Sequence, residues 1–172
     1  KTINAYYRMA AVFISLLAGL TACKISYSFS GVNISPEVLT YTVDYFPNRA
    51  PLVQAQLSQQ FTDALMDKIQ GNTSLDLATS GGDVQFSGEI TGYETRPTAI
   101  TRDEVAARNR LTISVNVRFY NNTKEDANFE QRFSFFYDYP ASAQLASVRD
   151  EAHQEIFERI NQEIFNRSLA DW

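Results

Sequence analysis

The side chains best suited to chemistry are a single cysteine, Cys23, and a single histidine, His153. A catalytic site needs a nucleophile with a base, paired carboxylates in a cleft, or a bound metal. His153 falls beside the apolar stripe of a predicted helix, so we interpret it as a surface or boundary residue. The acidic residues are scattered, and Gly81-Gly82 lacks the lysine and the following helix of a phosphate-binding loop. The sequence therefore predicts no enzyme, no metal site and no cofactor, unless the fold unites His153 with two acidic residues in a pocket.

Arginines are the strongest candidates for binding an anion. Five of the 15 basic residues fall within 23 positions: Arg96, Arg102, Arg108, Arg110 and Arg118. A guanidinium binds phosphate or carboxylate through two parallel hydrogen bonds and stays charged. The candidate contacts on the outer face of a sheet are Arg96, Arg110, Arg118 and Arg132. The alternative is a solvated strand face on which these arginines form ordinary salt bridges.

The first 22 residues differ in composition from the rest of the chain. Lys1 and Arg8 are the only charges there, and an apolar run of twelve residues extends from Met9 to Leu20. This run is too short to cross a bilayer comfortably as a helix and is typical of a secretory signal. Leu20-Thr21-Ala22-Cys23 then resembles the lipobox of bacterial lipoproteins, which directs lipid attachment and cleavage. The alternative is a short core helix that ends in an ordinary buried cysteine.

We therefore expect three parts: a lipoprotein signal peptide (1–22), a lipidated N-terminal tether (23–37) and one domain (38–172). Two or three acyl chains on Cys23 would anchor the protein in outer-membrane lipid, since each buried methylene contributes about 0.8 kcal/mol. No acidic run follows Cys23. Because such runs act as surface-export signals in some lipoproteins, their absence favours a domain that faces the periplasm.

Seven elements follow from the periodicity of the domain. Strands are predicted at 38–46, 74–79, 84–96, 111–119 and 129–139, and helices at 52–70 and 142–168. Pro97 has no amide donor and should mark the end of a strand or a sheet edge. A polar loop is expected at 99–108 and a turn at 121–124.

The alternation of apolar residues predicts which side of each strand is buried. The expected inner residues are Leu39, Tyr41, Val43 and Tyr45, then Val84, Phe86, Gly88 and Ile90, then Leu111, Ile113, Val115, Val117 and Phe119, and finally Phe133, Phe135 and Tyr137. Phe136 and Tyr120 fall on the outer side, where either a partner or the helices could cover them. The predicted fold is an α+β two-layer sandwich in the order β-α-β-β-β-β-α. Two helices pack on one face of a mixed, largely antiparallel sheet of about five strands.

Composition supports a compact domain and argues against one class of partner. Hydrophobic residues make up 44% of the chain and aromatic residues 13%, which is enough for a core. The 15 basic and 20 acidic residues give a formal net charge of -5. A nucleic-acid-binding protein needs a basic face that neutralises phosphates, so no nucleic-acid partner is expected.

Several short segments, in this order and behind this anchor, resemble the LptE family of lipopolysaccharide-assembly lipoproteins, in a branch distant from the enteric one. The segments are Tyr27-Ser28-Phe29-Ser30-Gly31, Val43-Asp44-Tyr45-Phe46-Pro47-Asn48 with Ala50-Pro51-Leu52, Phe86-Ser87-Gly88-Glu89-Ile90-Thr91-Gly92-Tyr93, Asn109-Arg110-Leu111-Thr112-Ile113, Phe129-Glu130-Gln131-Arg132-Phe133 and Asp171-Trp172. No single segment is diagnostic. Their joint occurrence covers nearly the whole mature chain.

The resemblance implies a role and two partners. Members of the family plug the lumen of the LptD β-barrel translocon, help it assemble, and with it deliver lipopolysaccharide to the outer leaflet. They have no catalytic residues. The resemblance carries over no lipopolysaccharide-binding residue, so only Cys23 transfers. A different possibility, given the same anchor and domain size, is a periplasmic lipoprotein that regulates or docks an envelope enzyme such as a peptidoglycan synthase.

Overall fold

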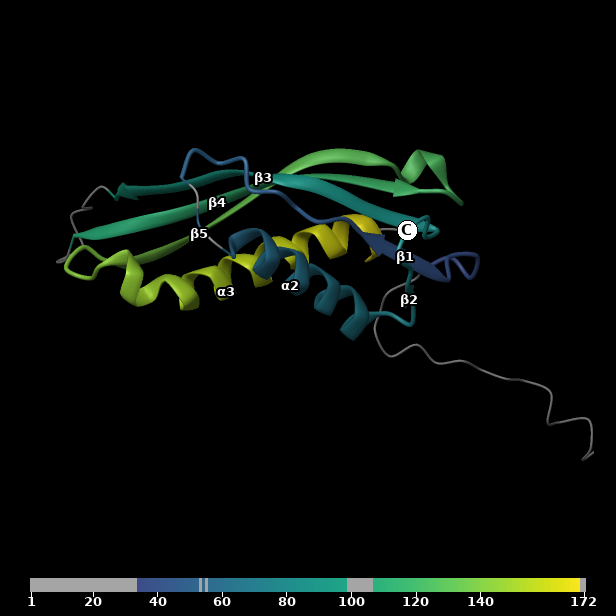
Figure 1. The fold of residues 1–172 in the computed structure, drawn as a ribbon, viewed down its shortest axis with the longest axis horizontal. Helices are drawn as coiled ribbons and strands as arrows, with labels where there is room; N and C mark the ends of the chain where they lie inside the picture. The colour runs from purple at the N-terminus through teal and green to yellow at the C-terminus, as the bar shows by residue number, and fades with distance from the viewer. Residues whose placement is uncertain (1–33, 53, 55, 99–106, 171–172) are drawn as a thin grey trace, which may run out of the picture.

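The computed structural model describes residues 34–170 except 53, 55 and 99–106. One five-stranded sheet forms the first layer and two helices form the second (Figure 1). The elements are β1 (Thr40–Val43), α2 (Leu57–Asn72), β2 (Asp76–Leu77), β3 (Val84–Pro97), β4 (Arg108–Asn121), β5 (Phe129–Pro140) and α3 (Leu145–Phe165). A 3-10 turn, η2 (Glu125–Ala127), precedes β5, and a π turn, η3 (Asn166–Ala170), extends α3. The α+β class is confirmed; the predicted signal peptide, Cys23 and the 99–106 part of the loop lie outside the described residues.

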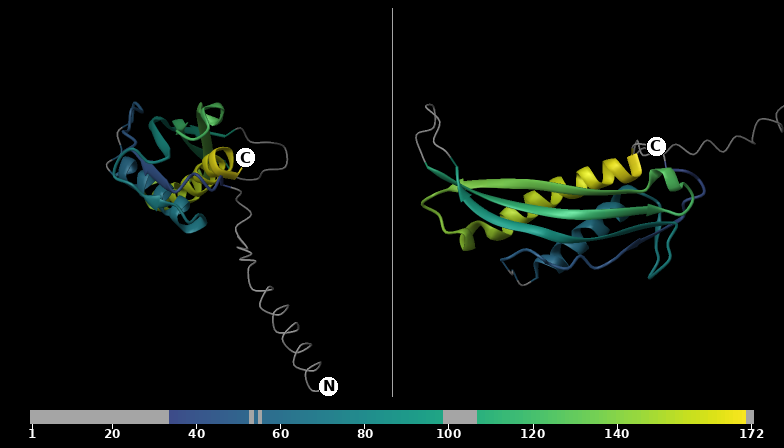
Figure 2. Two further views of the ribbon diagram at one scale, coloured as in Figure 1. Left: turned by 90° about the vertical axis from the view of Figure 1, so that its right-hand side faces the viewer. Right: turned by 90° about the horizontal axis from the view of Figure 1, so that it is seen from above.

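The sheet has the strand order β2-β1-β3-β4-β5. β1 is parallel to both β2 and β3, whereas β3, β4 and β5 form two long antiparallel ladders. The prediction of a mixed, largely antiparallel sheet is therefore confirmed. Both helices lie on the same face of this sheet, and α3 runs beneath the long strands (Figure 2).

The core lies between the sheet and the helices. β4 contributes the most regular set, because all five of its predicted inner residues are buried. Aromatic rings link the layers: Phe46 and Phe157 each meet Phe61 edge to face, with centroids 5.2 and 5.4 Å apart. Edge-to-face pairs of this kind add about 0.5–1.5 kcal/mol beyond the burial of apolar area. The structure thus confirms the inner faces predicted for β3, β4 and β5.

The first strand is shorter than predicted. β1 spans four residues in place of the expected 38–46, and Leu39 and Tyr45, which were predicted to be inner residues, are 65% and 58% exposed. At the first end of β1 the carboxylate of Asp83 accepts the N–H groups of Leu39 and Thr40, each at 2.9 Å, and so replaces a strand partner there. These two hydrogen bonds and the Thr40 hydroxyl also hold the pKa of Asp83 below its usual value.

Two other predicted elements were too long. The first helix was expected from Leu52 but begins at Leu57, because Gln56 adopts the left-handed conformation with φ 69° and interrupts any earlier turn. The strand predicted at 74–79 is reduced to the two residues of β2. By contrast, β4 extends past its predicted 111–119 at both ends, and β3 ends at Pro97 as expected. None of the described helices is both long and apolar enough to span a membrane.

A bulge in β3 changes which side chains face the helices. The pairing with β4 slips between Ile90 and Gly92, so Thr91 is the extra residue. Before the bulge the even-numbered residues of β3 point toward the helices. After it the odd-numbered Tyr93 does so, and its side chain is 3% exposed. Gly92 then lies opposite Ser114 on the outer side of the sheet.

Candidate functional site: the open face of the sheet

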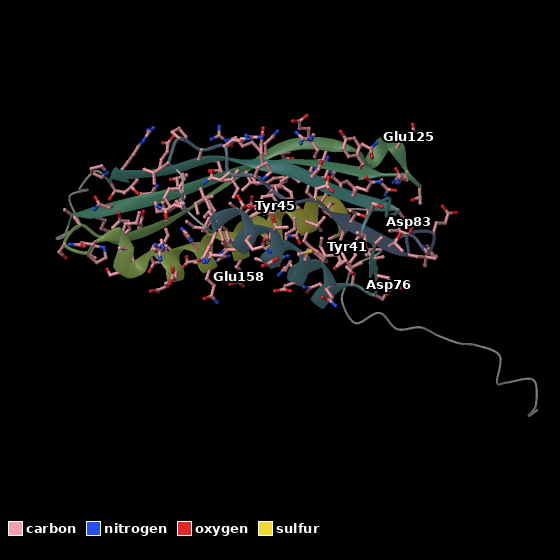
Figure 3. The ribbon with its side chains drawn as sticks, in the orientation of Figure 1. Tyr41, Tyr45, Asp76, Asp83, Glu125 and Glu158 are labelled. Carbon is pink, nitrogen blue, oxygen red and sulfur yellow. The ribbon has the colours of Figure 1, made fainter. Side chains whose placement is uncertain are left out.

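Both helices cover one face of the sheet, and no helix or strand among the described residues covers the other face of β3, β4 and β5. We call it the open face. Side chains project from it along the full length of the long strands (Figure 3). It contains all four predicted contact arginines, Arg96, Arg110, Arg118 and Arg132, and the two aromatic residues Tyr120 and Phe136, which are 46% and 39% exposed. The helices therefore do not cover Phe136.

Arg110 is the most firmly held of the four arginines. It lies opposite Asp138 on β5 and donates two hydrogen bonds to that carboxylate, each 2.7 Å long. Its guanidinium carbon also lies 3.6 Å from the centroid of the Phe136 ring, a cation–π contact. The hydrogen bonds from Arg110 outweigh partial burial and hold the pKa of Asp138 below its usual value. This cluster joins β4 to β5 through side chains on the open face.

Two more arginines pair with acidic neighbours. Arg96 lies 2.7 Å from Glu94, with both side chains mostly exposed. Arg118 lies 4.0 Å from Glu130, which also accepts a 2.6 Å hydrogen bond from Asn116. Exposed pairs of this kind contribute about 0–1 kcal/mol. For these two and Arg110 the structure supports ordinary salt bridges, the alternative raised by the sequence.

Arg132 differs from the other three. It is exposed, and no carboxylate among the described residues pairs with it. A Cβ placed on Gly92 would lie 3.5 Å from its Nη2 atom, so the guanidinium extends over the bulge of β3. Beside it the hydroxyls of Ser114 and Ser134 share a 2.9 Å hydrogen bond. The centre of the open face is thus polar, and of the four arginines only Arg132 has no carboxylate partner among the described residues.

The sequence alone missed the acidic partners of these arginines. Glu89, Glu94, Glu130 and Asp138 place both signs of charge on the open face. The signal was present in the hairpin formed by β4 and β5. In this hairpin Arg110 lies opposite Asp138. The sequence does not show that η2 forms part of the connection, so it does not fix the register of β4 against β5.

His153 was predicted to be a surface or boundary residue, and that prediction is wrong. Its side chain is 5% exposed and lies between the sheet and the helices. Its Nε2 atom is 3.1 Å from the Tyr93 hydroxyl and its Nδ1 atom 3.2 Å from Oε1 of Gln60. Burial lowers the pKa of His153, and the nearby Arg149 lowers it further while Asp150 opposes them. The bulge in β3 brings Tyr93 to this position, which no simple alternation could predict.

The helical layer contains a shallow groove of about 370 Å³. It is lined by Ala64, Asp67, Lys68, Asn72, Gln154, Phe157, Glu158 and Asn161. Glu158 marks it on the helical side of the molecule (Figure 3). His153 is not among its lining residues, and no group of three metal-ligating side chains occurs in the described part of the chain. The geometry therefore does not unite His153 with two acidic residues in a pocket.

The fold and the open face define a class: a two-layer α+β domain whose sheet has one face covered by helices and one polar face. A family model described as LptE, lipopolysaccharide-assembly, matches residues 38–168. The match covers well over half of the chain, which therefore belongs to the LptE family. A comparison with curated proteins finds no match.

Solved structures share this fold at low sequence identity. A hypothetical protein from Chlamydia trachomatis, CT253, aligns with a TM-score of 0.52 and 11% identity, covering 76% of this chain and 98% of that one. An uncharacterized lipoprotein B from Nitrosomonas europaea aligns with a TM-score of 0.49 and 13% identity, covering 84% and 88%. The first of these supports the fold and nothing beyond it.

Proposed function

We propose that this chain is an outer-membrane lipoprotein, anchored through Cys23, that plugs and helps assemble an LptD-type β-barrel translocon for lipopolysaccharide. The observation that carries the proposal is membership of the LptE family over residues 38–168. The lipobox-like segment before Cys23 supports the anchor, and the domain then faces the periplasm. The role is structural and binding rather than enzymatic.

The open face is our candidate for contact with the barrel or with lipopolysaccharide. Arg96, Arg110, Arg118 and Arg132 are the residues that we assign to it. The open face has charges of both signs, so it suits a partner surface with complementary charges, such as the inner wall of a barrel. Complementary charges of this kind contribute more to specificity and correct orientation than to affinity. Arg110 is already held by Asp138, so Arg118 and Arg132 are better placed to engage a partner.

A pull-down from native outer membranes tests the partner. The full chain with a C-terminal affinity tag is recovered in mild detergent, and co-purifying proteins are identified by mass spectrometry. We expect a large β-barrel of the translocon type in equal amount, retained through salt washes. Recovery of a peptidoglycan enzyme instead, or of no barrel, would overturn the assignment and leave the anchor to be tested separately.

Charge reversal tests the surface. Arg118→Glu should lower barrel recovery about tenfold, which corresponds to about 1.4 kcal/mol of binding free energy. Arg149→Glu on α3 is the matched control, since the Arg149 side chain is 44% exposed against 35% for Arg118 and also pairs with one carboxylate. Equal losses in both variants would show that the open face is not the contact surface.

A further inference from the structure

The groove between the two helices lies on the opposite side of the molecule from the open face. α2 and α3 meet at the rings of Phe61 and Phe157, and the residues of α2 that line the groove all follow this contact. Small-ligand sites in proteins measure about 300–1,000 Å³. A groove of about 370 Å³ therefore suits a ligand of about two or three amino-acid units and not a folded partner.

Three charged side chains line the groove: Asp67 and Lys68 on α2, and Glu158 on α3. None of them takes part in an ion pair within the described part of the chain. Burial is the main cause that raises the pKa of Tyr41, and the charge of Asp67 raises it further. The groove thus presents charges of both signs, with one negative charge in excess.

Asn161 adds a hydrogen-bond acceptor to these charges. It lines the groove from α3 and is 1% exposed, yet its Oδ1 atom accepts no hydrogen bond from the described residues. Buried polar atoms are nearly always hydrogen-bonded, because an unpaired one keeps its desolvation cost. Thr62 on α2 shows the usual case: its buried hydroxyl donates to the Ser58 carbonyl at 2.8 Å and accepts the Phe46 N–H at 3.1 Å. A ligand that pairs with Asn161 must bring a donor to the floor of the groove.

We propose that the groove binds a short peptide that has a free ammonium group at one end and a free carboxylate at the other. Lys68 on α2 pairs with the carboxylate, Glu158 on α3 pairs with the ammonium, and Asn161 accepts a peptide N–H. A peptide group suits the amide side chains of Asn161 and Gln154, since each amide is a donor and an acceptor at once. This inference goes beyond the translocon role and does not depend on it.

The charges of the groove disfavour other small ligands. A phosphate would meet Lys68 but also Asp67 and Glu158, and like charges repel. A simple amine would leave Lys68 unpaired, and a neutral sugar would leave all three charges unpaired. A ligand with one charge of each sign is complementary to the groove, and complementarity of this kind sets specificity.

Nuclear magnetic resonance of the full chain in a mild detergent tests the proposal, with triglycine as the probe. The readout is the side-chain amide of Gln154, whose signals are assigned by their loss in Gln154→Glu. Triglycine should shift these signals saturably, with a dissociation constant of about 1 mM. N-acetyltriglycine lacks the ammonium and triglycine amide lacks the carboxylate, so each should bind about fivefold more weakly.

Two variants assign the charged ends of the peptide. Lys68→Met should weaken triglycine about fivefold but should not weaken triglycine amide, which has no carboxylate for Lys68. Glu158→Gln should weaken triglycine likewise but should not weaken N-acetyltriglycine, which has no ammonium. Glu163→Gln is the control, since it makes the same charge change on α3 outside the lining of the groove and should leave all three dissociation constants unchanged.

Asn161→Leu separates binding from folding. Leucine has a similar size and no polar atom, so triglycine should bind at least about tenfold more weakly. The melting temperature should stay level or rise, because the variant removes a buried polar group that has no partner. Thr62→Val is the matched control: it removes two hydrogen bonds of a buried hydroxyl and should lower the melting temperature.

Two sets of results would overturn the proposal. The first is the absence of a saturable shift with triglycine, or equal binding of all three probes. The second is an Asn161→Leu variant that binds triglycine as the wild type does, or that loses as much melting temperature as Thr62→Val. Barrel recovery in the pull-down is a separate readout.

Discussion

Gly88 lies where β3, β4 and the segment after β1 meet, and a side chain there has no space. A Cβ on Gly88 would overlap the Asn116 carbonyl oxygen and lie 2.6 Å from Cε1 of Phe46. Because the first contact is with backbone, Gly88→Ala must move a central strand, and we expect it to lower the free energy of unfolding by about 3 kcal/mol. Chemical denaturation measures this change. Gly71→Ala in α2 is the control, since its Cβ meets nothing within 4 Å and should be neutral or stabilising by about 0.5–1 kcal/mol.

His153 makes the stability of the domain depend on pH. Its folded-state pKa is lowered by burial from the usual value of about 6.5, so between the two values the unfolded chain binds more protons. Stability should therefore be fully present above pH 7 and should fall as the pH drops below about 6.5. The neutral ring suits its contacts, because one nitrogen can donate to Gln60 while the other accepts from Tyr93.

Thermal unfolding between pH 7.5 and 5.5 measures this effect. The wild type should lose melting temperature across this range, whereas His153→Gln should start lower and change little. Asp83 and Asp138 do not interfere, since their lowered pKa values place their titration below this window. A wild type whose melting temperature is level from pH 7.5 to 5.5 would contradict the assignment.

At the scale of elements, apolar periodicity predicts which face of a strand or helix is buried. It does not predict the boundaries that depend on a distant residue or on one unusual backbone conformation. The inner residues of β4 and the extent of α3 follow from apolar periodicity alone. The start of β1 depends on Asp83, more than 40 residues away, whereas the start of α2 depends on the left-handed conformation of one residue, Gln56. The position of Tyr93 depends on one extra residue in β3. These are tertiary choices, which override local propensity.

The same distinction applies to the candidate site. The sequence predicted that these arginines lie on the outer face because they alternate with buried residues along each strand. Their partners were not, because cross-strand pairing requires the exact register. Arg110 illustrates this difference: its type and face were predicted, but its bidentate bond to Asp138 makes it more a structural residue than a contact.

At the scale of the whole molecule, the structure relates the domain to its proposed anchor. β1, β2 and the C-terminal end of α3 gather at one end of the elongated domain, and the turn between β5 and α3 lies at the other (Figure 1). Cys23 precedes Ile34, the first described residue, by eleven positions, a reach of at most about 40 Å. If Cys23 carries the lipid, this segment holds Ile34 within about 40 Å of the membrane.

Replacing Cys23 tests this arrangement. In a cloud-point partition the purified wild type should enter the detergent phase. Cys23→Ala removes the only thiol and with it the proposed acyl chains; because the lipobox also directs cleavage, the intact mass of the variant should show no acyl groups and a retained segment 1–22. The intact mass of the wild type should correspond to a chain that begins at Cys23 and carries acyl groups. Ser28→Ala, in the same tether, should partition like the wild type. Because Cys23 lies outside the predicted domain (38–172), Cys23→Ala should leave its melting temperature unchanged, and an unacylated wild type in the aqueous phase would refute the anchor.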